Sequence, residues 1–418
     1  MLKFLHAADI HLDSPLKGLE AYEDAPVDEI RGATRKAFDN LISLAIEERV
    51  AFVLIAGDLF DGDWKDYNSG IFFANRMGKL AREGIKVFIV SGNHDAACPI
   101  TKTMALPDNV TLFSRGKTQS VTLETQGVII HGRSYPSRTV TDNLASSFPE
   151  HTPGYLNIGL LHTSLTGHTG HETYAPCTLD DLKSKGYDYW ALGHVHQRKI
   201  ISENPWIVFS GNIQGRHIRE TGPKGAVLVH VKNDTIHRVE HRELDVLRWA
   251  ICQTDVSRSA TQDMILEQVR SSMEKKLEST KGKPLALRLE LMGSSPCHND
   301  LHSRFEHWTE AFHTIAAGLG QTWLEKVKIS TRRKTGSKDV SGENAPFSDI
   351  IKAVENLNLN QGELTEMDLD IASLKGKLTS ELIQENPVFS GDQDALTELK
   401  DSVRELLISR LMHKETRL

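Results

Sequence analysis

The sequence predicts an α/β protein whose core is a sandwich of β-sheets flanked by helices, followed by a small α+β domain and a helical C-terminal region. Short apolar runs alternate with segments of helical periodicity early in the chain. Later apolar runs follow one another without a helical segment between them, which indicates stacked sheets. The 418 residues, 39% hydrophobic and 25% charged, are typical of a globular protein with about two to three folded units.

The N-terminal strands and helices are expected to alternate. Strands rich in Val, Ile, Leu and Phe are predicted at Leu2–Ala8, Ala51–Ala56 and Lys86–Ser91, each ending at polar or glycine residues. Helices are predicted at Asp28–Glu48 and Asn68–Arg82, where apolar residues recur at helical spacing. Further strands are predicted at Gly127–Gly132, Tyr155–His162, Tyr187–Gly193, Trp206–Gly211, Gly225–Val231 and Thr235–Glu240.

The rest of the chain is expected to form appendages to a core of residues 1–250. Residues 255–330 are predicted to form an α+β cap with elements at Gln262–Leu277, Leu285–Leu291, Leu301–Leu319 and Trp323–Ser330. Residues 331–345 have almost no apolar side chains, which predicts a linker. Residues 346–418 are predicted to be helical, with one apolar stripe at Leu396, Leu399, Val403, Leu406, Leu407 and Leu411. That stripe suits packing on the core, a homodimer contact or a protein partner.

Composition limits the location and the partners of the protein. No apolar run approaches the roughly 18–20 residues that span a bilayer, and Asp9 interrupts the first apolar run before a signal-peptide core could form. The cysteines stand singly, so we expect reduced thiols and a cytoplasmic protein with no membrane segment. A net charge of −7 gives no general support to a nucleic-acid partner, although bound cations can reverse the local field at a site.

Five motifs place polar side chains directly after predicted strands. The motifs are ADIHLD, GDLFD, GNHD, LLHTS and GHVH, and their polar residues are Asp9, His11, Asp58, Asn93, His94, His162, His194 and His196. Carboxylate, imidazole and carbonyl ligands suit Mn²⁺, Fe²⁺ or Zn²⁺, and the lack of thiolates argues against an iron–sulfur or structural zinc site. In Asp-x-His and His-x-His, both side chains point the same way on an extended segment. The Asp-x-His and His-x-His pairs alone are equally compatible with a solvated polar surface, a lone histidine such as His162 is more often a satisfied polar residue, and GNHD is more specific.

Together and in this order, the motifs resemble those of the calcineurin-like metallophosphoesterase superfamily, DxH…GDxxD…GNHD…H…GHxH. The resemblance covers about the first 240 residues and implies a four-layer β-sandwich core. The flanking segments HAADIHLDSPLKGL, HGRSYPSR, HETYAPC, YDYWALGHVH and FSGNIQGRHIRETGPKG are similar to those of YhaO-type DNA repair exonucleases, relatives of the SbcD nuclease subunit.

The resemblance implies a centre with two divalent ions, Mn²⁺ first, with Fe²⁺, Zn²⁺ or Co²⁺ as alternatives. It implies that one ion is held by Asp9, His11, Asp58 and His196. It implies that the other is held by Asp58, Asn93, His162 and His194, so that Asp58 bridges the pair. Paired ions can lower the pKa of a water nucleophile and clamp a phosphate for in-line attack.

Two further residues receive catalytic roles from the resemblance. His94 corresponds to a histidine that orients the phosphate and protonates the leaving oxygen, which an imidazole of near-neutral pKa can do. Asp61 ends the GDxxD motif. Some relatives use a carboxylate there to orient the catalytic histidine, whereas DNA-nuclease relatives carry a histidine, so the role of Asp61 stays open.

Three residues after the FSGN segment are candidates for substrate contact. Arg216, His217 and Arg219 could neutralise phosphates, the main source of sequence-independent affinity for DNA. Salt bridges at the rim of the site are the equal alternative.

The leading hypothesis from the sequence is a metal-dependent DNA exonuclease, with endonuclease nicking as a second mode. It would act in DNA repair with an SMC-like ATPase of the SbcC kind, which relatives bind through C-terminal helices. The second hypothesis is a phosphatase or phosphodiesterase acting on small molecules, with the cap as a lid. The third is a non-catalytic DNA-end scaffold, against which the full set of ligands and His94 argues.

Overall fold

The computed structural model describes residues 2–14, 32–61, 67–97, 106–165 and 174–333, together with the single helical positions Val403 and Leu407. These residues form two compact units. The first contains Met1–Ile251, Leu277–Leu287 and Gln321–Glu325, and the second contains Cys252–Lys276, Arg288–Gly320 and the residues from Lys326 onward.

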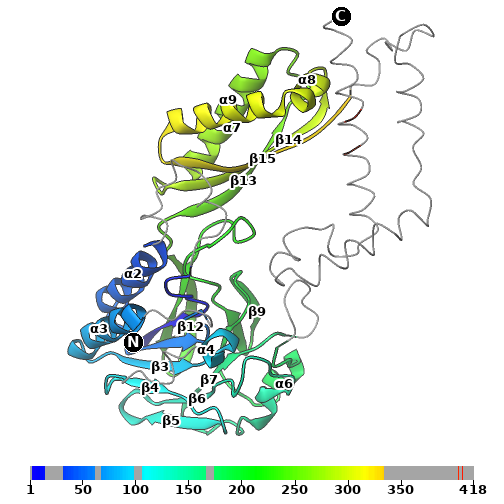
Figure 1. Ribbon diagram of the computed structural model, residues 1–418. Helices are drawn as coiled ribbons and strands as arrows, with labels where there is room; N and C mark the ends of the chain where they lie inside the picture. Colours follow the sequence, from blue (N-terminus) through cyan, green and yellow to red (C-terminus); the bar gives the residue numbers. More distant parts are fainter. Residues whose placement is uncertain are drawn as a thin grey trace, which may run out of the picture. The chain divides into compact units, whose positions relative to one another are not determined.

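Two six-stranded sheets form the centre of the first unit (Figure 1). The first sheet has the order β12-β11-β1-β2-β3-β4, with β1 at Leu2–Ala7, β2 at Phe52–Ala56, β3 at Lys86–Val90, β4 at Val110–Leu112, β11 at Gly225–Lys232 and β12 at Thr235–Glu243. The second has the order β5-β6-β7-β8-β10-β9, with β5 at Gln119–Leu123, β6 at Val128–Arg133, β7 at Leu156–His162, β8 at Tyr189–Gly193, β9 at Lys199–Glu203 and β10 at Trp206–Phe209. Strands β1 to β4 are parallel, as are β6, β7, β8 and β10.

The first unit is layered, and each layer buries the apolar face that its sequence provides. Helices α2 (Ala33–Glu47) and α3 (Tyr67–Arg82) pack on the outer face of the first sheet, with Phe38 and Phe73 in that core. A second core fills the space between the sheets, where Phe4 stacks on Phe52 at 5.0 Å. On the far side of the second sheet, Trp190 packs with residues of α6 (Leu179–Lys183) and η2 (Leu144–Ser147). The predicted α/β sandwich flanked by helices is confirmed.

Three edge strands that the sequence did not predict have little buried surface. Strands β4, β5 and β9 carry few fully buried side chains, because each lies at or beside a sheet edge. Their residues therefore lack the apolar pattern on which the prediction depends. The helix expected to start at residue 28 is described only from Ala33, because residues 15–31 lie outside the described part of the chain.

The second unit contains helices and most of a three-stranded sheet. The sheet has the order β13-β14-β15, with β13 at Arg248–Asp255, β14 at Leu285–Ser295 and β15 at Thr322–Arg333, and the division between the units falls within each strand. Helices α7 (Gln262–Ser279) and α9 (Phe305–Leu319) cover one face of this sheet (Figure 1). Buried side chains include Val269 of α7, Phe312 of α9 and Leu289 of β14.

Two predicted segments of this region differ from the structure. The single helix expected at Leu301–Leu319 was wrong: α8 (His298–Ser303) and α9 are separated at Arg304, which has φ −116° and ψ 38°. The Asp300 carboxylate stabilises the junction by accepting hydrogen bonds from Arg304 and from Trp308 Nε1, the latter at 3.0 Å. Strand β15 runs to Arg333, into the segment expected to be a linker.

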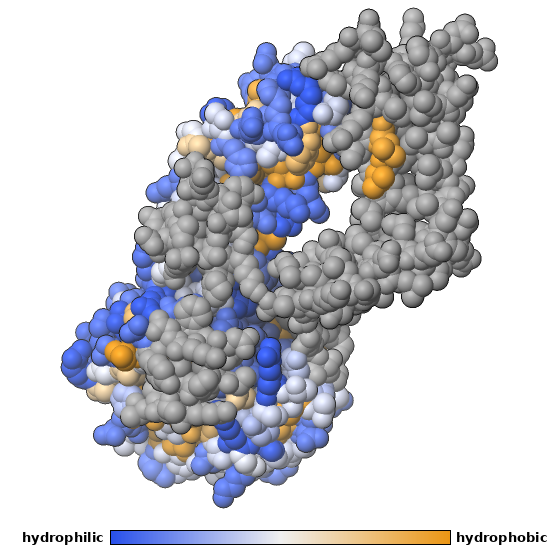
Figure 2. Space-filling model, in the orientation of Figure 1, coloured by the Kyte–Doolittle hydropathy of each residue, from blue (hydrophilic) through white to orange (hydrophobic). Residues whose placement is uncertain are grey.

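The described surface offers few large apolar side chains, and Figure 2 shows it as mostly hydrophilic. The predicted C-terminal helix lies outside the described residues except for Val403 and Leu407, which are helical and 47% and 43% exposed. Within the described ranges, no helix is both long and apolar enough to cross a membrane.

Candidate metal centre

The polar motifs meet where the carboxyl ends of the parallel strands of both sheets come together. The loops after β1 and β2 run side by side, because Asp9 N–H donates to Gly57 O at 3.0 Å and His11 N–H donates to Asp58 O at 3.0 Å. The second sheet joins this edge through His194, whose backbone N–H donates to Asp9 Oδ1 at 3.0 Å. Parallel strands bring their carboxyl ends to one edge, which is where open α/β sheets place their sites.

The backbone turns sharply at four of the predicted ligands. Asp9, His11, Asp58 and His194 have φ values of 49°, 44°, 52° and 102°. Non-glycine residues rarely adopt this left-handed region, which costs of the order of 1–3 kcal/mol and persists where the surrounding structure enforces it. Asp9 and His11 thus reach the same centre through successive tight turns rather than from an extended segment.

Two imidazoles and two carboxylates converge around the first predicted ion position. His11 Nε2 lies 3.4 Å from His196 Nε2 and 4.0 Å from Asp58 Oδ2, while His196 Nε2 lies 3.9 Å from Asp9 Oδ1. Ligand atoms of Asp9, His11 and His196 all lie within 4.8 Å of one another. The structure therefore brings together the four residues expected to hold one ion.

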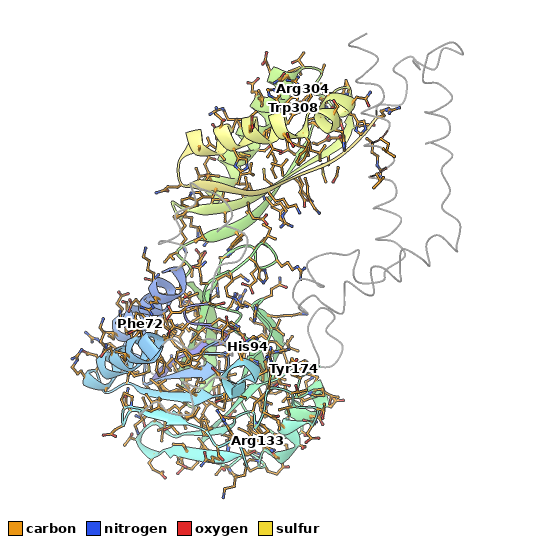
Figure 3. All side chains as sticks on the ribbon, viewed as in Figure 1. Phe72, His94, Arg133, Tyr174, Arg304 and Trp308 are labelled. Carbon is orange, nitrogen blue, oxygen red and sulfur yellow. The ribbon has the colours of Figure 1, made fainter. Side chains whose placement is uncertain are left out.

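The second predicted position is lined by the other ligands. His162 Nε2 lies 3.0 Å from Asn93 Oδ1 and 3.4 Å from Asp58 Oδ2. The rings of His162 and His194 lie 5.2 Å apart, and the ring of Tyr174, labelled in Figure 3, lies edge-on to His194 at 6.0 Å. Asp58 borders both positions, as a bridging ligand must.

The glycines of the motifs are required by close packing against these ligands. A Cβ on Gly57 would collide with the ring of His162, one on Gly193 with the carbonyl of Ala56 and with that ring, and one on Gly92 with Asp58. The strand-end glycines thus allow the backbone to approach the ligand side chains without a steric clash.

In three of the predicted ligand histidines, the ring nitrogen that faces away from the centre donates to an acceptor. His162 Nδ1 donates to Ala56 O at 2.9 Å, and His11 Nδ1 donates to Asp61 Oδ1 at 2.8 Å. His196 Nδ1 donates to Glu220 Oε1 at 2.5 Å. With Nδ1 protonated, the lone pair of a neutral imidazole lies on Nε2, which is the atom that faces the centre in all three residues.

The charges of the centre fit divalent cations. Burial lowers the pKa of His162 and His196, and burial together with the Arg216 charge lowers that of His11 to about 4, so these rings are neutral ligands at pH 7. Burial and the neighbouring Asp58 charge raise the pKa of Asp9 well above its usual range. Two carboxylates buried this close repel one another, and a bound cation would relieve that repulsion.

His94 lies at the start of α4 (Asn93–Ala97), next to the ligand Asn93 (Figure 3). Its Nδ1 is 3.2 Å from Asp61 Oδ1, and its side chain is 30% exposed, whereas that of His11 is fully buried. Burial opposes its protonation, but the Asp58 and Asp61 carboxylates raise the pKa of His94 to about 9. His94 also has a ligand atom within 4.8 Å of those of His11 and Asp58. One carboxylate oxygen, Asp61 Oδ1, thus lies 3.2 Å from His94 Nδ1 and 2.8 Å from His11 Nδ1.

The three candidate substrate residues lie in different environments. Arg216 lies at the centre, 3.8 Å from Asp61 Oδ1 and 3.4 Å from Glu220 Oε1, and its buried Nε has no hydrogen-bond partner among the described residues. His217 is half-buried with Nε2 3.5 Å from Glu220 Oε1, and Arg219 is exposed. Of the three, Arg216 is the one held directly beside the ligands.

Sequence reasoning missed two buried residues of the site. Glu220 lies in the loop after β10, and no motif pairs it with His196, which precedes it by 24 positions. Tyr135 packs edge-on to His162 with ring centroids 5.4 Å apart, and its buried hydroxyl has no hydrogen-bond partner in the described part of the chain. The RSYPSR and RHIRET segments that hold them are similar to segments of relatives, but neither contains a pattern of metal ligands that would mark it as part of the site.

A sandwich with a histidine, aspartate and asparagine cluster at its strand ends is the arrangement of a metallophosphoesterase. A family model described as calcineurin-like phosphoesterase matches residues 2–198, and one described as the middle domain of metallophosphoesterase YhaO matches residues 249–332. The chain is also 37% identical over 299 residues to the uncharacterized metallophosphoesterase YhaO of Bacillus subtilis strain 168, covering 71% of this chain and 72% of that protein. This chain belongs to the calcineurin-like metallophosphoesterase family.

More distant similarities extend to other members. The chain is 25% identical over 299 residues to the DNA double-strand break repair protein Mre11 of Sulfurisphaera tokodaii, covering 68% of this chain and 72% of that protein. Among solved structures it is similar to a dimetal phosphatase from Danio rerio, with 12% identity, a TM-score of 0.35, and coverage of 58% of this chain and 96% of that one. Members of the family are hydrolases that use divalent metal ions, and the described residues contain a candidate cluster for them.

Proposed function

We propose that this chain is a metal-dependent DNA nuclease that removes nucleotides from DNA ends and also nicks internally, using two ions, Mn²⁺ first among them. The observation that carries the proposal is the convergence of the seven predicted ligand residues on one buried centre, with His94 at its edge and its Nδ1 3.2 Å from Asp61 Oδ1. Hydrolysis of a phosphodiester needs both the metal centre and His94, because the nucleophile must be activated and the leaving alkoxide must receive a proton.

In this proposal the ions, when bound, supply an activated water and positive charge against the phosphate oxygens. The protein residues then complete the chemistry. His94 donates its proton to the departing sugar oxygen, and Asp61, 3.2 Å from its Nδ1, holds the ring in orientation. Arg216 lies beside Asp61 and adds a fixed positive charge that a phosphate can approach.

The choice of DNA as substrate has separate support. The DNA double-strand break repair protein Mre11 of Sulfolobus acidocaldarius is 23% identical to this chain over 419 residues, covering 94% of this chain and all of that protein. The likeness therefore includes the cap and C-terminal region as well as the metal-binding core. We propose a repair role on this basis.

We further propose that residues 346–418 bind an SMC-like ATPase of the SbcC kind, that residues 331–345 act as a linker and that residues 255–330 form a cap on a core of residues 1–250. Exposed Val403 and Leu407, one helical turn apart, support a docking role for the stripe. Alternatively, the same stripe could join two copies of the chain in a homodimer.

One assay separates the proposed nuclease from its competitors. Full-length protein with Mn²⁺ is incubated with end-labelled linear DNA, closed circular DNA and bis(p-nitrophenyl) phosphate, with Asp58→Ala as the inactive control. We expect shortening of linear DNA, slower nicking of circles, and loss of both with EDTA. Hydrolysis of the small ester alone would support a small-molecule phosphodiesterase instead. DNA binding without hydrolysis of any substrate would support a scaffold, and undiminished hydrolysis by metal-free protein in EDTA would refute the metal mechanism.

A further inference from the structure

Glu220 is a buried carboxylate whose two oxygens are both used. It is 4% exposed, and its Oε1 accepts from His196 Nδ1 at 2.5 Å. Its Oε2 accepts from Asn212 Nδ2 at 2.8 Å and from the backbone N–H of Arg216 at 2.7 Å. One side chain therefore connects a metal-facing histidine to the loop that follows β10.

The same loop holds His196 from its backbone as well. Lys224 Nζ donates to His196 O at 3.0 Å, and Asn212 N–H donates to the same carbonyl oxygen at 3.2 Å. The Arg216 guanidinium lies between Glu220 and Asp61, at 3.4 and 3.8 Å. Glu220 is thus a buried acceptor for His196 Nδ1–H, Asn212 Nδ2–H and the Arg216 backbone N–H.

His196 and His11 differ from His162 in the acceptor behind the ring. His196 and His11, at the first position, donate Nδ1–H to the carboxylates of Glu220 and Asp61. His162, at the second, donates to the neutral carbonyl oxygen of Ala56. A carboxylate behind a histidine fixes its tautomer and makes its free nitrogen a stronger ligand, which is worth about 10–100-fold in metal affinity.

We propose that Glu220 is a positioning residue that sets the metal affinity of the His11 and His196 position while leaving the Asn93 and His162 position unchanged. The proposal rests on the metal centre of the proposed function. It assigns to the RHIRET segment the task of holding His196 Nε2 toward His11 Nε2, 3.4 Å away.

Glu220→Gln tests the idea because it keeps the shape and reverses one hydrogen bond. If the amide NH₂ of the glutamine faces His196, Nδ1 of that ring must accept its hydrogen bond. The ring proton then lies on Nε2, where it blocks metal binding. If the NH₂ instead faces Asn212 and the Arg216 N–H, donors oppose donors and the loop loses its anchor. Either arrangement weakens the same ion position.

The experiment is titration of metal-free full-length protein with Mn²⁺ by calorimetry, with elemental analysis of bound metal. Wild type should bind two ions. Glu220→Gln should retain one unchanged site and weaken the other about 10–100-fold. Glu240→Gln is the matched control, because Glu240 Oε1 lies 3.4 Å from His230 Nε2 at a carboxylate–imidazole pair outside the centre. Both sites should stay intact in that variant.

The outcomes distinguish the failure of this inference from the failure of the metal centre. Wild-type affinity at both sites in Glu220→Gln would overturn the positioning role, as would equal weakening of both sites. If Glu220→Gln does not fold, Glu220→Asp, which keeps the charge, is titrated under the same criteria with a smaller loss expected at one site. A wild-type protein that binds no Mn²⁺ would instead refute the metal centre itself.

Discussion

Substitution of Gly92 by alanine should remove metal from the centre without any change to a ligand residue. Gly92 lies in the GNHD motif, and a Cβ built on it would lie 2.9 Å from both Asp58 Cγ and Asp58 backbone N, and closer still to Oδ1. Ordinary contact begins at 3.4 Å, so the carboxylate must move by at least about 0.5 Å, the difference between the two distances. Rotation of the side chain cannot relieve the clash with the backbone nitrogen.

The size of that shift decides the expected effect. Metal–ligand distances vary by only about 0.2 Å within a given site, so a displaced Asp58 is lost to both ions that it is expected to bridge. We expect Mn²⁺ affinity to fall by at least about 10–100-fold and the hydrolytic rate by on the order of 10²-fold. Overpacking should also lower the free energy of unfolding by about 1–3 kcal/mol.

The assay is Mn²⁺ calorimetry, thermal unfolding by circular dichroism, and hydrolysis of bis(p-nitrophenyl) phosphate. Gly78→Ala is the control, since Gly78 lies within α3 and a Cβ there meets nothing within 4 Å. That variant should keep both metals and gain up to about 1 kcal/mol from helix propensity. Two Mn²⁺ ions bound with wild-type affinity by Gly92→Ala would refute the steric argument.

Two other predictions test the remaining roles. His94→Asn should keep both metals and bind DNA nearly normally while the rate on DNA falls about 10²–10⁴-fold, with a smaller loss on a nitrophenyl ester, whose leaving group needs no proton. Elemental analysis and rates on both substrates check this, and loss of metal would show that His94 is a ligand. Truncation before Phe347 should leave a metal-binding protein that hydrolyses small phosphodiesters but no longer co-purifies with an SMC-like ATPase. Aggregation or metal loss in the truncated protein would contradict the assignment of residues 346–418 to partner binding.

The residue types of the centre could be predicted because the chemistry restricts them. Divalent ions of this class take carboxylate, imidazole and carbonyl ligands, and the strand ends of an α/β fold are where such ligands can meet. Asp58 and His162 follow strongly apolar strands, β2 and β7, whose pattern is visible in the sequence. The sequence pattern alone therefore indicates that these ligands converge at one edge of the fold.

The path by which the ligands converge could not be predicted. Asp9 and His11 were expected to point the same way because they alternate along an extended segment, yet both have positive φ. The turns form because the loop after β1 pairs with the loop after β2, about 50 residues away in sequence. Backbone conformation at these residues is thus set by long-range hydrogen bonds rather than by local preference.

The sequence by itself determined the layered α/β class through apolar periodicity, the donor atoms offered to a metal through residue chemistry, and the family through the resemblance of its five motifs. Only the tertiary structure decided which atoms face the centre. His196 Nδ1 faces the Glu220 carboxylate, and His94 Nδ1 lies 3.2 Å from Asp61 Oδ1. Such contacts join loops that are distant in sequence. The residue that orients a ligand side chain therefore leaves no periodic pattern in the sequence. The hydrogen-bond partners of the ligand side chains are therefore determined by the tertiary fold.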